Sequence, residues 1–229
     1  MSQQLFITRK RKKWKFAQFN QWTNCFQVSH VSPELWATYF KHAQPLTVEI
    51  GAGRADLSVE LARQRPEHNF VAVDIKSDRL YTGAKTALEE KLSNIAFVRA
   101  ELRQMGELFV PGSIAELWLT FPDPFERKKH AKHRLTHPNF LQTYKQLLAP
   151  GGVLHFKTDN RELFLWSLEQ LVAEDWKLHE LNFDLHASDL PEAYKITTYY
   201  ERKFMAEGTP INFVSCQPSI LERYSIKVI

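Results

Sequence analysis

Between residues 45 and 158 the chain alternates short apolar runs with longer amphipathic segments. The runs at 46–50 and 70–74 have the length and the apolar content of buried strands. The segments at 56–65 and 77–92 place apolar residues at helical spacing. Because strands alternate with helices, the pattern predicts βαβ units, which form a mostly parallel sheet with helices on both faces. The chain is therefore predicted to adopt an α/β fold.

The rest of the chain extends this prediction. We expect further strands at 95–98, 114–119 and 152–157, and helices at 140–148 and 167–174. The strand-like segments at 211–214 and 224–228 suggest an antiparallel hairpin that closes the sheet. Repeats and low-complexity linkers are not evident. The simplest organisation is a basic N-terminal arm at residues 1–30 and a single domain at residues 31–229.

The composition is typical of an intracellular globular protein with one domain. The chain has 229 residues, 44% of them hydrophobic, which is enough for one sizeable core. No run approaches the roughly 18 apolar residues of a membrane span, and no long apolar segment follows the N-terminus as in a secretory signal. Cys25 and Cys216 form no motif, so reduced thiols are expected. These features predict a cytoplasmic location.

The first basic cluster is the run Arg-Lys-Arg-Lys-Lys-Trp-Lys at residues 9–15, which aromatic residues follow. Blocks of like charge are commonly disordered tails that aid solubility or targeting. The alternative is an arm that orders on a nucleic-acid backbone, where cations displace counterions and rings stack on bases. A second basic cluster after Asp123 favours the alternative.

Asp123 lies between Pro122 and Pro124, where the apolar run at 114–119 ends and a strongly basic segment begins. The two prolines fix the backbone and keep the acid out of a helix. In open α/β sheets, ligands bind just beyond the carboxyl ends of the strands. This arrangement suggests a reaction site that faces a polyanion. The alternative is an ordinary strand-to-loop turn with a solvated basic face.

The first strand-to-helix turn contains Gly51 and Gly53, which permit a tight turn and close approach to a ligand. A dinucleotide fingerprint requires a third glycine at position 56, where this chain has Asp56. The turn therefore gives little support to a cofactor with a diphosphate.

Four acids follow successive predicted strands and would face the same rim of the sheet. Carboxylates there accept hydrogen bonds from ribose hydroxyls, an adenine amino group or an α-ammonium group. S-adenosylmethionine fits such a rim, since it carries a sulfonium and an ammonium group and no phosphate. The alternative is that some of these acids lie in first turns of helices, where they are favourable anyway. The four acids are Glu49, Asp74, Glu101 and Asp123.

Several motifs resemble the bacterial-type tRNA (guanine-N7-)-methyltransferases, which belong to the class I S-adenosylmethionine-dependent group. The motifs are Val-Glu-Ile-Gly-Ala-Gly at 48–53, Phe-Pro-Asp-Pro-Phe at 121–125 and Lys-His-Ala-Lys-His-Arg-Leu at 129–135. Pro-Gly-Gly at 150–152, Lys-Thr-Asp at 157–159 and the segment 198–204 follow in order. The glycine-rich motif is common to class I enzymes, whereas the acid between prolines and the late Thr-x-x-Glu are more specific.

The resemblance implies a Rossmann-like class I methyltransferase fold and a guanine of the tRNA variable loop as substrate. It implies a catalytic role for Asp123, and S-adenosylmethionine binding by Glu49, Gly51, Gly53, Asp74, Glu101 and Asp123. It implies substrate binding by Arg127, Asp159, Thr198, Tyr199, Tyr200 and Glu201. It associates a last group with RNA binding, namely Lys128, Lys129, His130, Lys132, His133 and Arg134.

Four positions depart from the family pattern. Ala55 stands where a third glycine is usual, and Glu101 stands where Asp is usual. Phe125 replaces a Trp, and Arg127 replaces a Lys, which is not its equivalent at a phosphate or a base edge. No departure removes a charge, so we expect an active enzyme.

Guanine N7 has a free lone pair, so methyl transfer to it requires no general base. Catalysis then depends on proximity, alignment and electrostatics, and Asp123 would stabilise the positive charge that the purine gains. Glu201 and Asp159 are candidates for the remaining guanine edge. His130, His133 and His137 lie in a basic loop without a carboxylate or cysteine cluster, so no metal site is expected.

Two other functions stay open from the sequence. The first is a class I methyltransferase that acts on another RNA or on an exocyclic amine. Enzymes that methylate exocyclic amines typically have two consecutive prolines after the acid. Here the acid lies between two prolines. The other is an inactive homologue that binds RNA.

Overall fold

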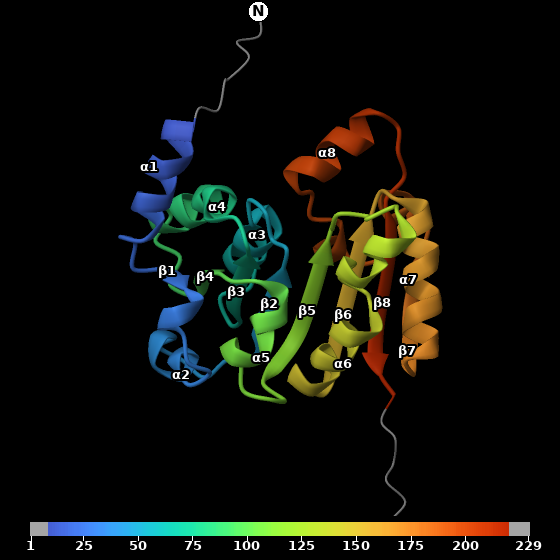
Figure 1. Ribbon diagram of the computed structural model, residues 1–229, viewed down its shortest axis with the longest axis horizontal. Coiled ribbons are helices and arrows are strands. Elements are labelled where there is room, and N and C mark those ends of the chain that lie inside the picture. The colour runs from blue at the N-terminus through green and yellow to red at the C-terminus, as the bar shows by residue number, and fades with distance from the viewer. Residues whose placement is uncertain (1–8, 220–229) are drawn as a thin grey trace, which may run out of the picture.

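The computed structural model describes residues 9–219, which contain an eight-stranded sheet with the order β1-β4-β3-β2-β5-β6-β8-β7 (Figure 1). Strands β1 to β6 run parallel, and β8 runs antiparallel to both β6 and β7. The prediction of a mostly parallel sheet with an antiparallel hairpin is confirmed. The strands are β1 (Cys25–Gln27), β2 (Leu46–Ile50), β3 (Asn69–Asp74), β4 (Ile95–Arg99), β5 (Ile114–Thr120), β6 (Leu148–Thr158), β7 (Trp176–Asn182) and β8 (Asn212–Pro218).

The central strands are mostly apolar because helices cover them on both sides. Every residue of β2 and β3 is buried, including the polar Thr47, Glu49, Asn69 and Asp74. In β5, Leu117 belongs to one hydrophobic core and Trp118 to the other, because successive side chains point to opposite faces. The sheet thus separates two cores, and both contribute to the stability of the fold.

Two sets of helices cover the two faces, as predicted. One core includes buried residues of α2 (Leu35–Tyr39), α5 (Met105–Leu108), α6 (Pro138–Leu147) and α7 (Arg161–Ala173). The other includes buried residues of α3 (Asp56–Gln64) and α4 (Ser77–Glu89). None of the helices among residues 9–219 is long and apolar enough to cross a membrane.

The segment predicted as an N-terminal arm folds against the domain from residue 9 onward. Its basic run lies in α1 (Arg9–Phe19), and Phe19 at the end of this helix is fully buried. The Trp22 ring stacks on Tyr81 of α4 at 4.8 Å between centroids, and Cys25 in β1 pairs with Phe97 in β4. Aromatic anchors among the charges therefore attach the segment, and β1 forms an edge of the sheet within the predicted arm.

The C-terminal hairpin differs from the prediction in its partner strand. β8 lies between β6 and β7, so the strand that pairs with it on the outer side comes from residues 176–182. The predicted strand at 224–228 lies outside the described residues. β7 was not predicted because it is an edge strand in which exposed and half-buried residues alternate, so it lacks an apolar run.

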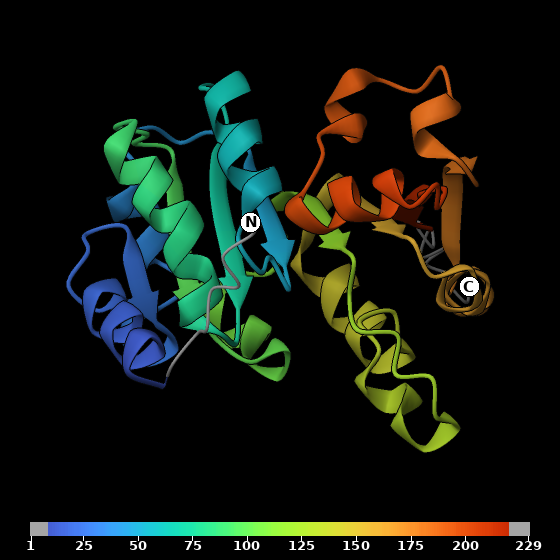
Figure 2. The same ribbon diagram turned by 90° about the horizontal axis from the view of Figure 1, so that it is seen from above.

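The chain between β7 and β8 covers the carboxyl ends of the central strands. It contains two short 3-10 helices, Leu185–Ala187 and Glu192–Lys195, and then α8 (Tyr199–Ala206). Figure 2 shows α8 above the strand ends, with its first residues beside α3. A hydrogen bond supports this position, since the backbone N–H of Tyr199 donates to the side-chain oxygen Asp56 Oδ2 at 2.9 Å. The segment thus covers part of the carboxyl-end edge of the sheet, which is where ligands bind in open α/β sheets.

Candidate active site

A cavity of about 490 Å³ opens at the carboxyl ends of β2, β3, β4 and β5. The strand order reverses between β2 and β5, so this is the topological switch point at which open α/β sheets bind ligands. The volume lies within the usual range for small-molecule sites, roughly 300 to 1,000 Å³. Both apolar and charged side chains form its walls, including Ile50, Val73, Asp74, Glu101, Leu102, Phe121, Asp123, Phe125, His133, Leu135 and Phe140.

The glycine-rich turn after β2 forms one wall of the cavity through Gly51. Gly51 has a φ of +70°, and a Cβ built on it would lie 3.4 Å from Leu135 Cδ1. The backbone N–H of Gly53 donates to Asp74 Oδ2 at 2.8 Å, and that of Lys76 donates to Asp74 Oδ1 at 2.7 Å. Asp74 therefore fixes the turn, and each of its oxygens keeps a lone pair for a ligand donor.

Glu101 follows β4 and lies in the cavity wall. Its side chain caps the short 3-10 helix Leu102–Gln104, and Gln104 Oε1 accepts from the Glu101 backbone N–H at 3.0 Å. Arg103 Nε lies 2.7 Å from Glu101 Oε2, and the Glu101 side chain is 45% exposed. The acid is thus oriented at the cavity and stays accessible to a ligand.

Asp123 lies on an exposed loop with an unusual backbone. Phe121 and Phe125, on either side of the Pro-Asp-Pro, have φ values of +47° and +43°. This left-handed region costs a bulky residue on the order of 1 to 3 kcal/mol and persists only where the surroundings hold it. Phe121 N donates to Lys157 O at 2.9 Å, which ties the loop to β6. The loop is therefore strained and held, and it places Asp123 at the cavity.

The basic segment after Asp123 forms the 3-10 helix η3 (Lys128–His133). Lys128, Lys129 and Lys132 are exposed, and His133 lines the cavity with its ring 5.6 Å from that of Phe125. The predicted RNA-binding residues of η3 thus lie at the edge of the cavity.

Arg134 differs from the other residues predicted to bind RNA. Its Nε donates to Pro124 O at 3.0 Å and its Nη2 donates to Phe125 O at 3.2 Å. The guanidinium also lies 4.5 Å from the centroid of the Trp166 ring. Since these contacts engage the guanidinium inside the protein, Arg134 holds the strained Asp123 loop rather than presenting a free cation.

Glu49, predicted to bind the cofactor, is not among the residues that line the cavity. It is buried, and its Oε2 accepts from Ser58 Oγ at 2.5 Å and from Ser58 N at 3.2 Å, while its Oε1 accepts from Thr120 Oγ1 at 2.7 Å. Burial raises the pKa of Glu49 to about 7, against the opposing effect of these hydrogen bonds. The carboxyl group therefore joins β2, α3 and β5 behind the turn, and cofactor binding by Glu49 stays a prediction.

Thr198 and Glu201 form a reciprocal capping box at the start of α8. Glu201 N donates to Thr198 Oγ1 at 3.2 Å, and Thr198 N donates to Glu201 Oε2 at 3.1 Å. Lys157 Nζ contacts the two Glu201 oxygens at 2.8 and 3.1 Å, and His186 Nε2 lies 2.9 Å from Oε1. Because Glu201 is fully buried and both oxygens are engaged, it does not present a carboxylate to a substrate in this structure. These contacts fix the start of α8, and substrate binding by Thr198 and Glu201 stays a prediction.

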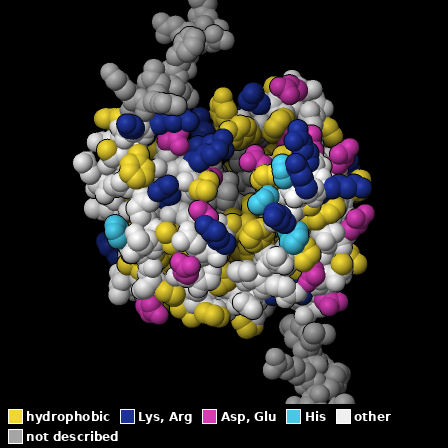
Figure 3. Space-filling model, viewed as in Figure 1, with side chains coloured by type: hydrophobic (Ala, Val, Ile, Leu, Met, Phe, Trp, Pro, Cys, Tyr) yellow, Lys and Arg dark blue, Asp and Glu magenta, His cyan; other side chains and the backbone are white. Residues whose placement is uncertain are grey.

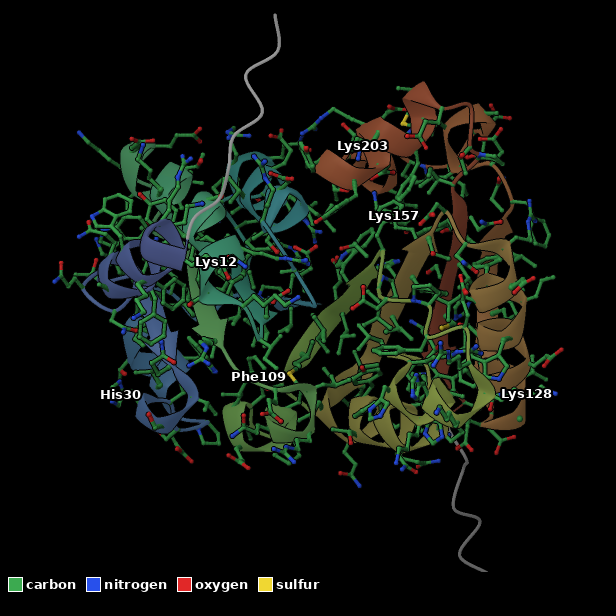
Figure 4. All side chains as sticks on the ribbon, turned by 45° about the horizontal axis from the view of Figure 1, so that its top comes forward. Lys12, His30, Phe109, Lys128, Lys157 and Lys203 are labelled. Atoms are coloured by element: carbon green, nitrogen blue, oxygen red, sulfur yellow. The ribbon has the colours of Figure 1, made fainter. Side chains whose placement is uncertain are left out.

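Lys157 was predicted only as part of a motif, and its burial was missed. Its Nζ also donates to Ile196 O at 2.7 Å and to Tyr194 O at 3.3 Å. Burial lowers the pKa of Lys157, while the charge and hydrogen bonds of Glu201 oppose this shift. Figure 4 shows Lys157 beside α8. This one ammonium group ties β6 to the whole segment that leads into α8.

The other predicted substrate residues occupy two sides of the site. Tyr199 and Tyr200 are exposed on α8, and the Arg54 guanidinium lies 4.7 Å from the centroid of the Tyr199 ring. Asp159 follows β6, and partial burial raises its pKa. Arg127 is exposed at the start of η3. The structure thus places Tyr199 near the glycine-rich turn and Arg127 at the start of η3, four residues after Asp123.

Several cavity residues were not predicted from the sequence. Lys76 and Arg79 follow β3, and their closeness to Asp74 in the chain was the signal that could have found them. Leu135 and Phe140 reach the cavity from beyond η3, which local patterns do not reveal. Within residues 9–219 no three His, Cys, Asp or Glu side chains are grouped so as to hold a metal ion.

Comparisons with known proteins show the family to which the chain is similar. A family model described as "Putative methyltransferase" matches residues 43–214. The tRNA (guanine-N(7)-)-methyltransferase of Cytophaga hutchinsonii is 41% identical over 182 residues, which are 78% of this chain and 82% of that protein. The enzyme of the same name from Christiangramia forsetii is 38% identical over 77% of this chain and 80% of its own length. That from Bacteroides thetaiotaomicron is 32% identical over 96% of this chain and 91% of its own.

Solved structures share the fold at much lower identity. The 16S rRNA methyltransferase KamB has a TM-score of 0.62 and 16% identity, covering 82% of this chain and 93% of its own. A 30S ribosomal A1408 methyltransferase from an uncultured bacterium has a TM-score of 0.61 and 12% identity, covering 82% of this chain and 95% of its own. These similarities confirm the predicted class I methyltransferase fold.

Proposed function

This chain belongs to the tRNA (guanine-N(7)-)-methyltransferase family, and we propose that it methylates N7 of a guanine in the variable loop of tRNA, with S-adenosylmethionine as methyl donor. One observation supports the proposal most directly. Asp74, Glu101 and Asp123, from three successive strand ends, line one cavity, and the basic helix η3 lies at its edge. Because tRNA is its substrate, we place the protein in the cytoplasm.

The cavity suits the chemistry of S-adenosylmethionine. Asp74 has acceptor capacity for ribose hydroxyls, and Glu101 lies one strand further along, where an adenine amino group or an ammonium group can donate to it. Ile50, Val73 and Leu102 give apolar walls for the adenine ring. When bound, this cofactor supplies an electrophilic methyl group on a sulfonium.

The residues of the chain need to supply alignment and charge rather than a base. Guanine N7 carries a free lone pair, so no proton leaves it before attack. The purine ring gains positive charge as N7 is alkylated, and the Asp123 carboxylate can stabilise that charge and accept from the N1 or N2 hydrogens. The strained loop between Phe121 and Phe125 holds Asp123 before the substrate arrives, which lowers the cost of alignment.

The substrate base has to leave the folded tRNA to reach Asp123, as in other enzymes that modify bases. Lys128, Lys129 and Lys132 on η3, with Arg127, are placed to hold phosphates near that base. Tyr199 and Tyr200 are exposed on the other side, and their rings offer surfaces for stacking. Glu201 acts in this scheme by fixing α8, through its bonds to Lys157 and the cap.

The test uses purified protein, methyl-labelled S-adenosylmethionine and an unmodified tRNA transcript. Label in the RNA, located by chain cleavage at 7-methylguanosine in the variable loop, would support the proposal. Label at another position would keep the fold and the cofactor and overturn the choice of site. No label, with tRNA still bound, would favour an RNA-binding protein without activity.

A further inference from the structure

α1 concentrates positive charge to an extent that the fold does not require. Six of its eleven residues are Lys or Arg and none is an acid. Arg11 and Lys15 are spaced i, i+4, where like charges on a helix destabilise it. Because this repulsion between like charges does not stabilise the helix, the basic residues of α1 point to a role in binding rather than in folding.

Little within the described residues neutralises this charge. Among the side chains that the structure describes, α1 makes a single ion pair, in which Lys12 Nζ lies 3.9 Å from Asp78 Oδ2. Burial and the nearby cations Arg11 and Arg54 lower the pKa of Lys15, against the effect of Asp78. Most of the positive charge of α1 is therefore left without an acidic partner in the part of the chain that the structure describes.

The position of α1 connects this charge to the candidate active site. Tyr81 of α4 anchors the helix, since Lys15 Nζ lies 5.0 Å from the Tyr81 ring centroid and the Trp14 ring lies 5.6 Å from it. Asp78, the partner of Lys12, directly precedes Arg79, which lines the cavity. We call Arg11, Lys12, Lys13 and Trp14 the α1 surface; all four are exposed, and Trp14 is 53% exposed.

The α1 surface and η3 lie on opposite sides of the cavity. Figure 4 shows Lys12 and Lys128 on opposite sides of the molecule, and Figure 3 shows Lys and Arg side chains on both sides of a central hollow. His133 of η3 and Arg79 beside Asp78 both line the cavity, so each basic surface is adjacent to its wall. A strand that inserts one base into the cavity has phosphates on both sides of that base.

We propose that the α1 surface binds the RNA backbone on the side of the cavity opposite η3. Its Lys and Arg side chains neutralise phosphates and release counterions, and the exposed Trp14 ring stacks on a base. The proposal rests on the proposed function, since it assigns a second contact surface to the same RNA substrate. Backbone contacts of this kind fix the position of the RNA and carry no sequence information.

The test compares two double variants with equal loss of charge. Lys12→Gln with Lys13→Gln changes the α1 surface, and Lys41→Gln with Lys177→Gln removes two exposed lysines outside the site. The dissociation constant for an unmodified tRNA transcript is measured against salt concentration. We expect the first variant to bind about tenfold more weakly and to lower the logarithmic salt slope by about 2, one for each lost phosphate contact. The control should match the wild type.

Further readouts separate this inference from the proposed function. Affinity for S-adenosylmethionine and turnover at saturating tRNA should be unchanged in the α1 variant, and Trp14→Ala should weaken tRNA binding without changing the salt slope. An α1 variant with the wild-type salt slope, or a control with the same loss, would overturn the inference alone. Wild-type protein that binds tRNA with an α1-dependent slope but transfers no methyl group would overturn only the proposed function. Wild-type protein that binds no tRNA would overturn both.

Discussion

Gly83 in α4 lies against the backbone of the glycine-rich turn, and a methyl group there should disturb that turn. A Cβ built on Gly83 would lie 2.6 Å from Arg54 O, 3.0 Å from Ala55 Cβ and 3.1 Å from Phe97 Cε1. Ala55 is fully buried and already has a φ of +57°, so this part of the turn has little freedom to move. Gly83→Ala therefore tests whether the close packing of α4 holds the glycine-rich turn in place.

The expected magnitude follows from two opposing effects. Ala is favoured over Gly inside a helix by about 1 kcal/mol. Overpacking of a tight site costs typically about 1 to 3 kcal/mol, and the contact at 2.6 Å is to a backbone oxygen that cannot rotate away. The difference predicts that Gly83→Ala lowers the free energy of unfolding by up to about 2 kcal/mol, or a few degrees in Tm for a chain of this size. Affinity for S-adenosylmethionine should fall as well.

Gly106→Ala is the matched control. Gly106 lies in α5, and a Cβ built there would meet nothing within 4 Å, so this variant should be neutral or gain up to about 1 kcal/mol. Urea unfolding measures both free energies, and isothermal calorimetry measures cofactor affinity. A Gly83→Ala protein as stable as the wild type, with unchanged cofactor affinity, would refute the reasoning.

Three further variants test other parts of the account. The pKa of Glu49 is about 7 in the folded protein and near 4.5 in the unfolded chain, so the free energy of unfolding should fall as the pH rises through this window. Glu49→Gln should remove up to about 3 kcal/mol of this pH dependence. Urea unfolding of both proteins at pH 5 and pH 8 measures the difference. Asp123→Asn should reduce turnover about 100-fold in the methyl-transfer assay and leave Tm almost unchanged, because the side chain is exposed. Lys157→Met should lower the free energy of unfolding by about 3 to 5 kcal/mol by leaving Glu201 buried without its cation, and adding Glu201→Leu should recover part of that loss.

The central sheet could be predicted because its strands are buried on both faces. β2 and β3 are rich in apolar residues, and α3 and α4 place apolar residues at helical spacing. Edge strands gave no such signal, since β1 has three residues and β7 alternates half-buried with exposed positions. The helix α1 could not be predicted because its run of like charges is typical of a disordered tail, although Phe19 at its end is fully buried.

The site could be predicted as a set of residues but not as a set of contacts. Acids at successive strand ends were expected to meet, and three of them line the cavity, namely Asp74, Glu101 and Asp123. The carboxylate of the fourth, Glu49, accepts hydrogen bonds from Ser58 and Thr120, and no pattern in the sequence predicted these partners.

The Thr-x-x-Glu motif has a structural role in addition to the substrate role that the resemblance implies. The same spacing that marks the family also forms a capping box, which predicts a helix start at Tyr199. The buried partner of Glu201 is Lys157, which lies 44 residues earlier in the chain. Only the three-dimensional arrangement shows that this carboxylate is fully engaged.

The most direct test of the account concerns the acceptor atom. A tRNA transcript with 7-deazaguanosine at the variable-loop guanine keeps the base-pairing edge but has a carbon in place of N7. Its methyl-group incorporation is measured beside that of the unmodified transcript. The account predicts that this substituted tRNA still binds and accepts no methyl group. Equal incorporation into both transcripts would contradict it, because the methyl group would then go to an atom other than N7 of that guanine.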